Sequence, residues 1–207
     1  MAIFDFMEKF KTFAERVIQP SPVILGLRLK PFSLGHSMIL KTAKSVFILG
    51  GMEKLTNKEL IGELVFALLV CSTTYDDFLA EMNYGTFQSN LEAYVKQLIK
   101  EVKGAQLFNL FQKVNAFGLY IKQGTSTPYY YVADSSSDVS NNAVEIEQSI
   151  MASLMSECNY SRNECLNLPL TETLSAFLLY AHKQGTVSLM SKAEYDLRKS
   201  LKNNVES

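Results

Sequence analysis

The chain has 207 residues with 20 Lys and Arg against 21 Asp and Glu, and this even balance argues against nucleic acid as a main partner. Apolar residues make up 47%, which is ordinary for a globular protein and excludes extensive disorder. The most apolar run, residues 60–72, contains Glu63 and is far shorter than the roughly 20 residues that span a bilayer. We expect a globular protein with no nucleic-acid and no membrane partner.

The cysteines indicate a reducing compartment. Cys71, Cys158 and Cys165 form an odd number without CxxC spacing, which does not suit a disulfide framework. The first ten residues, MAIFDFMEKF, lack the basic start and the unbroken apolar stretch of a signal peptide. We therefore expect the protein in the cytoplasm.

The first predicted element is an amphipathic helix over residues 3–17. Phe6, Phe10 and Phe13 repeat at helical spacing on one side, and the prolines within residues 19–22 end the helix. Packing on the protein's own core is the default role for such a helix, and docking on a partner or membrane surface is the alternative.

Residues 23–72 contain clear signals for the start and the end of helices. Residues 23–30 are short and partly alternating, so they could be extended. Ser33 is a plausible N-cap for one helix through Leu49, which Gly50 and Gly51 close. Thr56 and Glu59 have the spacing of a capping box in front of the apolar helix 60–72, which we expect to be buried nearly all round.

Further helices follow in the middle of the chain. We expect a turn or two of helix over 76–82, a break at residues 84–86, a helix ending at Gly104, and an amphipathic helix over 105–121. Its buried face is predicted to hold four residues: Leu107, Leu110, Phe111 and Val114. Residues 117–121 could equally be a strand, and 129–132 suggest a small hairpin or an exposed aromatic lip.

A polar stretch over residues 135–142 separates the main body from the C-terminal part. Three helix starts are predicted after it, from the pairs Asn142 with Glu145, Ser161 with Glu164, and Ser191 with Glu194. A fourth helix begins near Pro169 and stops at Gly185. The predicted units are an N-terminal helix and Pro linker (1–22), a main helical domain (23–134), a polar linker (135–142) and a C-terminal helical segment (143–207).

The predicted fold class is therefore mainly α: a compact multi-helix domain with a small β-hairpin and a C-terminal helical segment. The chain contains no internal repeat and no βαβ alternation.

Residues with chemical potential do not form a recognisable site. Cys158, Cys165 and His182 lack a fourth ligand and match no common zinc spacing. His36 lies in the first turn of its predicted helix, where a capping role explains it adequately. Clustered acids at 59, 63, 76, 77 and 81 are best interpreted as solvated faces. We expect no catalytic residue, no metal, no cofactor and no enzymatic activity.

Protein binding is the remaining interpretation. Exposed aromatic and methionine side chains are adaptable contact groups, although filling the core is the commoner role for Met. The candidate partner-binding residues are Phe6, Phe10, Phe13, Tyr129, Tyr130, Tyr131, Met151 and Met155. A second copy of the chain is one conceivable partner, which would make a homo-oligomer.

Two stretches resemble small proteins encoded among the tail genes of long-tailed bacteriophages and prophages. The first is LGLRLKPFSLGHSMIL, Leu25 to Leu40, followed by FILGG and an apolar helix ending in LLVCS. The second is NYSRNECLNLPLTETLSAFLLYAHKQG, Asn159 to Gly185, in which a YSR-type turn, a short helix and an L-P-L step lead into another helix. Residues 128–131 (PYYY) and the polar stretch 135–142 lie where such proteins carry a variable insert.

This resemblance to tail assembly chaperones implies a role in virion morphogenesis. Such a chaperone would bind the long tape-measure protein, keep it soluble, and help tail-tube subunits gather round it in the host cytoplasm. The resemblance implies no catalytic residues. Two alternatives stay open: a permanent virion component such as a head-tail adaptor or tail protein, and a small enzyme using Cys165 and His182.

Overall fold

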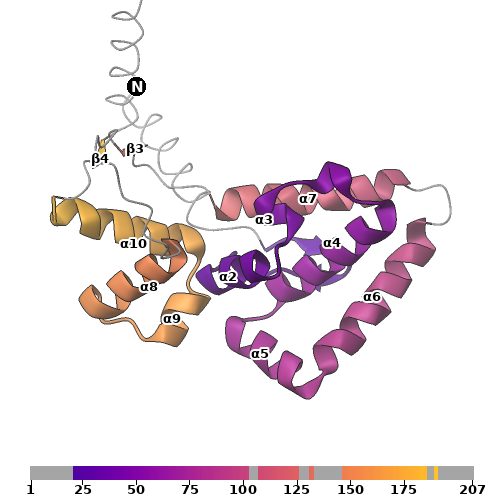
Figure 1. The fold of residues 1–207 in the computed structure, drawn as a ribbon, viewed down its shortest axis with the longest axis horizontal. Helices are drawn as coiled ribbons and strands as arrows, with labels where there is room; N and C mark the ends of the chain where they lie inside the picture. The colour runs from indigo at the N-terminus through magenta and orange to yellow at the C-terminus, as the bar shows by residue number, and fades with distance from the viewer. Residues whose placement is uncertain (1–20, 103–106, 126–130, 133–145, 186–188, 191–207) are drawn as a thin grey trace, which may run out of the picture.

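The computed structural model describes residues 21–102, 107–125, 131–132, 146–185 and 189–190, and these form a mainly helical protein (Figure 1), which confirms the predicted fold class. The longer helices are α2 (Leu34–Thr42), α4 (Asn57–Ser72), α5 (Tyr75–Tyr84), α6 (Thr86–Val102), α7 (Leu107–Gly124), α8 (Ile146–Glu157) and α10 (Leu170–Lys183). The short ones are α3 (Val46–Leu49), the 3-10 turn η1 (Met52–Lys54) and α9 (Arg162–Asn167).

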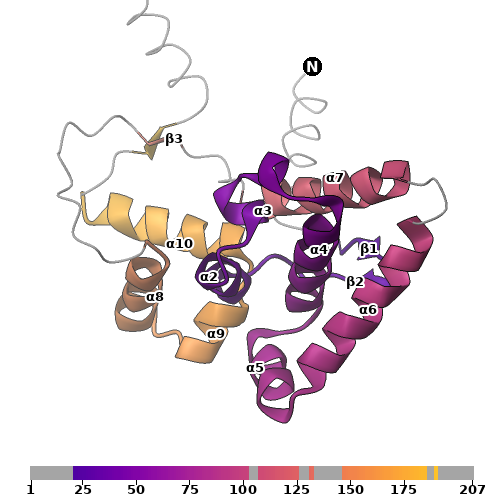
Figure 2. The same cartoon turned by 45° about the vertical axis from the view of Figure 1, so that its right-hand side comes forward.

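Helix α4 is the centre of the main core. The predicted capping box is confirmed: the Thr56 hydroxyl accepts from the Glu59 backbone N–H, and the Glu59 carboxylate accepts from the Thr56 backbone N–H at 2.8 Å. Because α4 is apolar on almost every side, it can be surrounded. It packs against α2, α6 and α7, as Figures 1 and 2 show from two directions.

The chain enters this core through a tight hairpin. Strands β1 (Val23–Ile24) and β2 (Leu27–Arg28) pair antiparallel, with Val23 opposite Arg28. Both turn residues, Leu25 and Gly26, have positive φ angles of 54° and 76°, as a type I′ turn requires. The extended conformation considered for residues 23–30 is confirmed for the two paired strands.

The single helix predicted from Ser33 to Leu49 is wrong, because two helices occupy this range. After α2, the N–H groups of Lys44 and Ser45 donate to the carbonyls of Lys41 and Leu40 at 2.9 Å, while Lys44 takes a left-handed φ of 56°. This Schellman motif ends α2 with Lys44 at the left-handed position that a glycine usually occupies. Gly50, with φ of 78°, closes α3 as expected.

Helices α5, α6 and α7 form the other side of the main body. Gly85 separates α5 from α6 in the left-handed conformation, at the predicted break. Residues 117–121 belong to α7, so the strand alternative for them is wrong. Leu110 and Val114 are buried on α7 as predicted, but Phe111 is 49% exposed and points away from that buried face.

The small hairpin suggested for residues 129–132 falls partly outside the described residues, which here begin at Tyr131. Tyr131 and Val132 form strand β3, which pairs antiparallel with β4 (Leu189–Met190), far along the chain. Gly124 is the last residue of α7, where a Cβ would lie 2.4 Å from the Phe32 Cβ. The absence of a Cβ at Gly124 therefore lets Phe32 approach α7 closely.

The C-terminal helices α8, α9 and α10 enclose a smaller core of Ile150, Leu154 and Cys165. The predicted capping box at Ser161 and Glu164 is confirmed, and Pro169 is the N-cap residue of α10. In both views this group lies beside α2, on the side away from α6 (Figures 1 and 2). Met151 and Leu174 pack against both cores and so join them.

No helix among the described residues is both long and apolar enough to cross a bilayer. Several predicted features lie outside the described residues: the helix over 3–17, the end at Gly104, the polar linker 135–142, and the helix starts at Asn142 and Ser191.

Candidate binding site

The residues before α2 and before α10 are joined directly. The backbone N–H of Leu170 donates to the carbonyl of Phe32 at 2.7 Å, and that of Leu34 donates to Leu168 at 3.3 Å. Ser33 and Pro169 form an isolated antiparallel bridge between these bonds. The two segments that carry the family resemblance therefore contact one another in the folded chain.

His36 fixes the start of α2 from both sides of its ring. Nδ1 accepts from the Ser33 backbone N–H at 3.1 Å, so Nε2 must carry the proton and donate to the Thr73 carbonyl at 2.8 Å. Burial lowers the pKa of His36, against the opposing effect of the bond to the Thr73 carbonyl. The neutral ring completes the cap and ties α2 to the end of α4, which confirms the capping role predicted for it.

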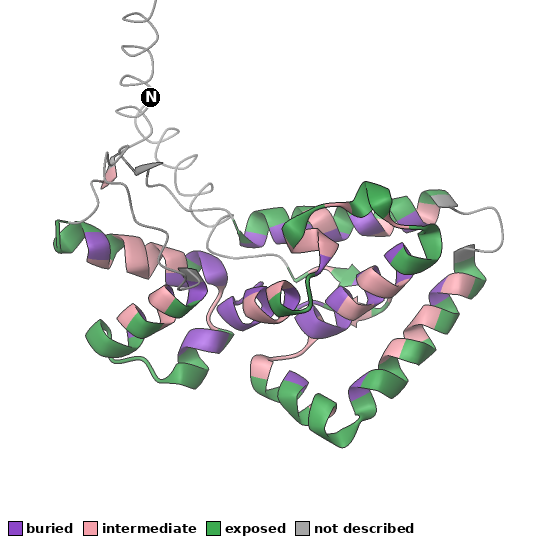
Figure 3. Cartoon of the chain, in the orientation of Figure 1, coloured by how far each residue is buried: buried purple, intermediate pink, exposed green. Residues whose placement is uncertain are grey.

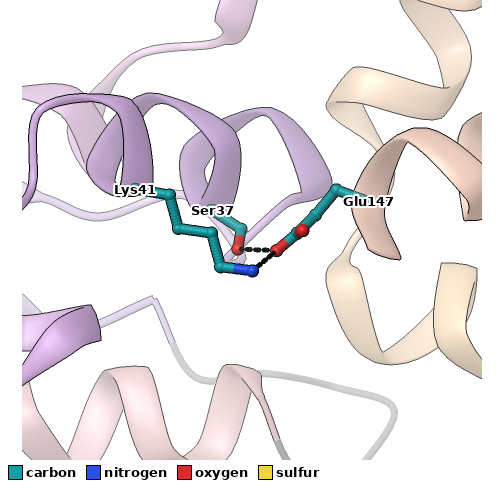
Figure 4. Close-up of polar contacts among 3 residues, drawn as sticks. All are labelled: Ser37, Lys41 and Glu147. Carbon is teal, nitrogen blue, oxygen red and sulfur yellow. Dashed lines mark hydrogen bonds and ion pairs between the residues drawn. The ribbon is translucent and has the colours of Figure 1, made fainter. Parts of the chain in front are cut away.

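Next to His36 on α2, Ser37 and, one turn later, Lys41 contact Glu147 from α8 (Figure 4). The Ser37 hydroxyl donates to Glu147 Oε1 at 3.1 Å, and Lys41 Nζ forms an ion pair with the same oxygen. Burial acts to raise the pKa of Glu147, but hydrogen bonds from Lys41, from its own backbone and from Ser37, with the Lys41 charge, outweigh this and lower it. Glu147 is therefore held as a carboxylate.

These three residues form one wall of a pocket with a volume of about 330 Å³ that is partly open to solvent. The rest of the lining is almost entirely apolar and comes from α3, α7, α8 and α10. Its residues are Phe47, Ile48, Ile121, Thr125, Ile150, Leu170 and Leu174. An apolar pocket with a few convergent polar groups is the usual form of a binding site.

The polar wall of this pocket is a hydrogen-bonded ion pair. Ser37 and Lys41 are one helical turn apart; the Lys41 ammonium is ion-paired and the Ser37 hydroxyl donates to Glu147. Ser37 and Lys41 share a helix face that sequence spacing could reveal, whereas Glu147 lies 110 residues from Ser37 and had no local signal.

The predicted Cys and His candidates differ in burial and in their neighbours. Cys165 is buried, Cys158 is exposed, and His182 Nδ1 accepts from the Leu189 backbone N–H at 3.4 Å. Burial raises the pKa of the Cys165 thiol, which makes it a poor nucleophile. No three His, Cys, Asp or Glu side chains among the described residues are grouped as metal ligands.

A second feature is an apolar surface on α7. Phe108, Phe111 and Leu119 are 71%, 49% and 59% exposed, and their spacing of three and eight residues places them on one side of the helix. Leu110, Val114, Phe117 and Ile121 occupy the opposite, buried side. We call the three exposed residues the α7 outer face. Figure 3 shows that exposed positions are also frequent on α5 and α6.

The structure places two of the predicted partner-binding side chains. Met151 is half-buried between the two cores, and Met155 on the same helix is 41% exposed. Tyr131 begins strand β3, although its side chain is not described. Phe6, Phe10, Phe13, Tyr129 and Tyr130 lie outside the described residues.

The chain was compared with protein-family models, with curated proteins and with solved structures, and nothing in any of the three matched it. The resemblance to tail assembly chaperones accordingly stands on the two quoted motifs alone.

Proposed function

We propose that this protein is a non-enzymatic binding factor that holds another protein through apolar surface, and that it acts as a tail assembly chaperone. The observation that carries the proposal is the α7 outer face. Its three large apolar side chains are 49% to 71% exposed on the solvent side of one helix, and none belongs to either core cluster of the described residues. Exposed apolar side chains grouped on one face of this kind mark binding surfaces.

The energetics suit a reversible complex. Complete burial of one Phe or Leu side chain contributes roughly 1.5–3 kcal/mol, so the α7 outer face offers several kcal/mol before the cost of association is subtracted. Gln112, Asn115 and Lys122 are exposed on the same helix and keep the surface hydrated when it is empty. A chaperone needs such a surface, which binds an unassembled client and later releases it.

The resemblance of Leu25–Leu40 and Asn159–Gly185 to tail assembly chaperones supplies the identity of the client. By that resemblance, the client is the tape-measure protein, which the chaperone would hold in the host cytoplasm until tail-tube subunits gather round it. A long apolar helix on the client would lie against the α7 outer face.

Co-expression tests this proposal. Where a neighbouring gene encodes a long coiled-coil chain, that chain is taken as the client. It is expressed with and without this protein, and its soluble fraction and co-purification are measured. We expect a soluble complex only when both are present. Equal client solubility in both cultures, with no complex, would overturn the proposal. Stoichiometric presence of this chain in purified virions would instead indicate a permanent virion component.

A further inference from the structure

The pocket beside Glu147 contains an unused hydrogen-bond acceptor. Glu147 is 4% exposed, and its contacts with Ser37 and Lys41 are both made to Oε1. Its other oxygen, Oε2, is buried, and no described residue donates a hydrogen bond to it. A buried carboxylate oxygen without a donor is costly, so a bound group that supplies one would be favoured.

The charge of the wall restricts what that donor can be. Lys41 already neutralises Glu147, so a second cation would enter an apolar pocket without a net negative charge to compensate it. A neutral N–H or O–H donor meets no such penalty. The rest of the pocket is lined mainly by apolar side chains, among them Phe47, Ile121 and Leu174. The donor should therefore be attached to an apolar group.

The volume of the pocket limits the size of the apolar group that can carry this donor. A volume of about 330 Å³ is near the lower end of the range for ligand sites and is large enough for one aromatic side chain. Two natural side chains combine an aromatic ring with one neutral donor, the indole of Trp and the phenol of Tyr. Both are enriched among the residues that dominate protein interfaces.

We propose that this pocket is an anchor site for an aromatic side chain of a bound protein, a Trp or Tyr whose N–H or O–H donates to Glu147 Oε2. This inference rests on the proposed protein-binding function and adds the kind of residue that the partner inserts. Ring atoms would contact Phe47, Ile121 and Leu174, while Ser37 and Lys41 hold the acceptor in place.

The chain contains no Trp, so the fluorescence of added indole can be followed with excitation at wavelengths where the 10 Tyr residues do not absorb. Titrations compare indole with N-methylindole, which lacks the donor. We expect indole to bind about tenfold more tightly, as a hydrogen bond to a charged group implies. Equal affinities, or binding of neither compound, would overturn the proposal.

A double variant, Lys41→Met with Glu147→Met, removes the acceptor and leaves the wall apolar without an unpaired charge. In this variant we expect indole and N-methylindole to bind with equal affinity. A tenfold preference that persists would show that the extra methyl group is excluded by size, which would overturn the assignment of Glu147 as acceptor. Circular dichroism checks that the variant is folded.

Displacement separates a protein side chain from a free small molecule as the occupant. Adding the purified client should release bound indole, and a client variant with its Trp and Tyr residues changed to Leu should not. Client binding that leaves indole in place would overturn the anchor site while leaving the proposed function intact. Indole binding without any client complex would instead contradict the proposed function.

Discussion

Gly35 in α2 lies so close to the carbonyl of Leu166 in α9 that no larger residue fits between them. A Cβ at this position would be 2.7 Å from the Leu166 oxygen and 2.8 Å from the Tyr75 ring. Beside this contact, the Tyr75 backbone N–H donates to the Asn167 side chain at 3.0 Å. The start of α2 is thus held between α5 and α9, and this junction sets the position of Ser37 and Lys41.

Replacing Gly35 with Ala should destabilise the protein by about 1–3 kcal/mol, because a backbone oxygen cannot move aside as a flexible side chain can. The matched control is Gly62→Ala in α4, where an added Cβ meets nothing within 4 Å and should stabilise by about 0.5–1 kcal/mol. Urea unfolding followed by circular dichroism measures both. Two variants of equal stability would show that the α2–α9 approach is looser than described.

His36 should make the stability depend on pH below its ordinary pKa of about 6.5. Since burial lowers the pKa in the folded state, the unfolded chain binds the proton first, and stability falls as pH drops from 6.5 towards the folded value. The variant His36→Asn should lose this slope, whereas His182→Asn should keep it. Urea unfolding at closely spaced pH values is the measurement. An unchanged slope in His36→Asn would contradict this account of the ring.

The Lys41 and Glu147 pair should respond unequally to its two single substitutions. Lys41→Met leaves an unpaired carboxylate that is 5% exposed, whereas Glu147→Met leaves an ammonium that is 33% exposed and can reach water. We expect Lys41→Met to lower the free energy of unfolding by about 2–4 kcal/mol. This is less than breaking a fully buried ion pair would cost, because Lys41 is partly exposed. Glu147→Met should lower the free energy of unfolding by clearly less. The double variant should also be less destabilised than Lys41→Met.

The pH dependence of the same pair has a defined sign. The folded pKa of Glu147 lies below its ordinary value, so its contribution is present above pH 4.5 and is lost as pH falls through the folded pKa. In Lys41→Met the pKa should rise, and acidification towards pH 5 should then stabilise that variant. A double-mutant cycle at pH 7 and at pH 5 measures both effects. Equal coupling energies between the two substitutions at the two pH values would contradict them.

One of the three thiols should react in the native protein. Cys158 is exposed, whereas Cys71 and Cys165 are buried, and burial raises the pKa of both. Ellman's reagent should therefore titrate one equivalent before unfolding and three in denaturant. Cys158→Ala should abolish the native reaction. Rapid native reaction at a second site would indicate that one of the cores opens readily.

Local sequence signals predicted many of the helix boundaries. Thr56 with Glu59 and Ser161 with Glu164 begin helices through bonds between residues three apart, and such bonds do not depend on the rest of the fold. Gly85 and Gly50 ended helices for the same local reason, their positive φ. The end of α2 was missed because Lys44 takes the left-handed position that usually marks a glycine.

Features that depend on distant residues could not be predicted. Strand β3 finds its partner β4 only through the tertiary fold, and Glu147 meets Ser37 across 110 residues. On α7 both sides carry large apolar residues, so periodicity could not decide that Phe111 is outside and Leu110 inside. The candidate site is built from these distant relationships, which is why its residues were not among those named from sequence.

The α7 outer face provides the most direct test of the proposed function. A triple variant, Phe108→Ser with Phe111→Ser and Leu119→Ser, is co-expressed with the client beside wild type and a control, Leu179→Ser, which removes a 46% exposed apolar residue from α10. We predict that all three proteins fold, by circular dichroism, and that only the triple variant fails to keep the client soluble. Full client solubility with the folded triple variant would contradict the account.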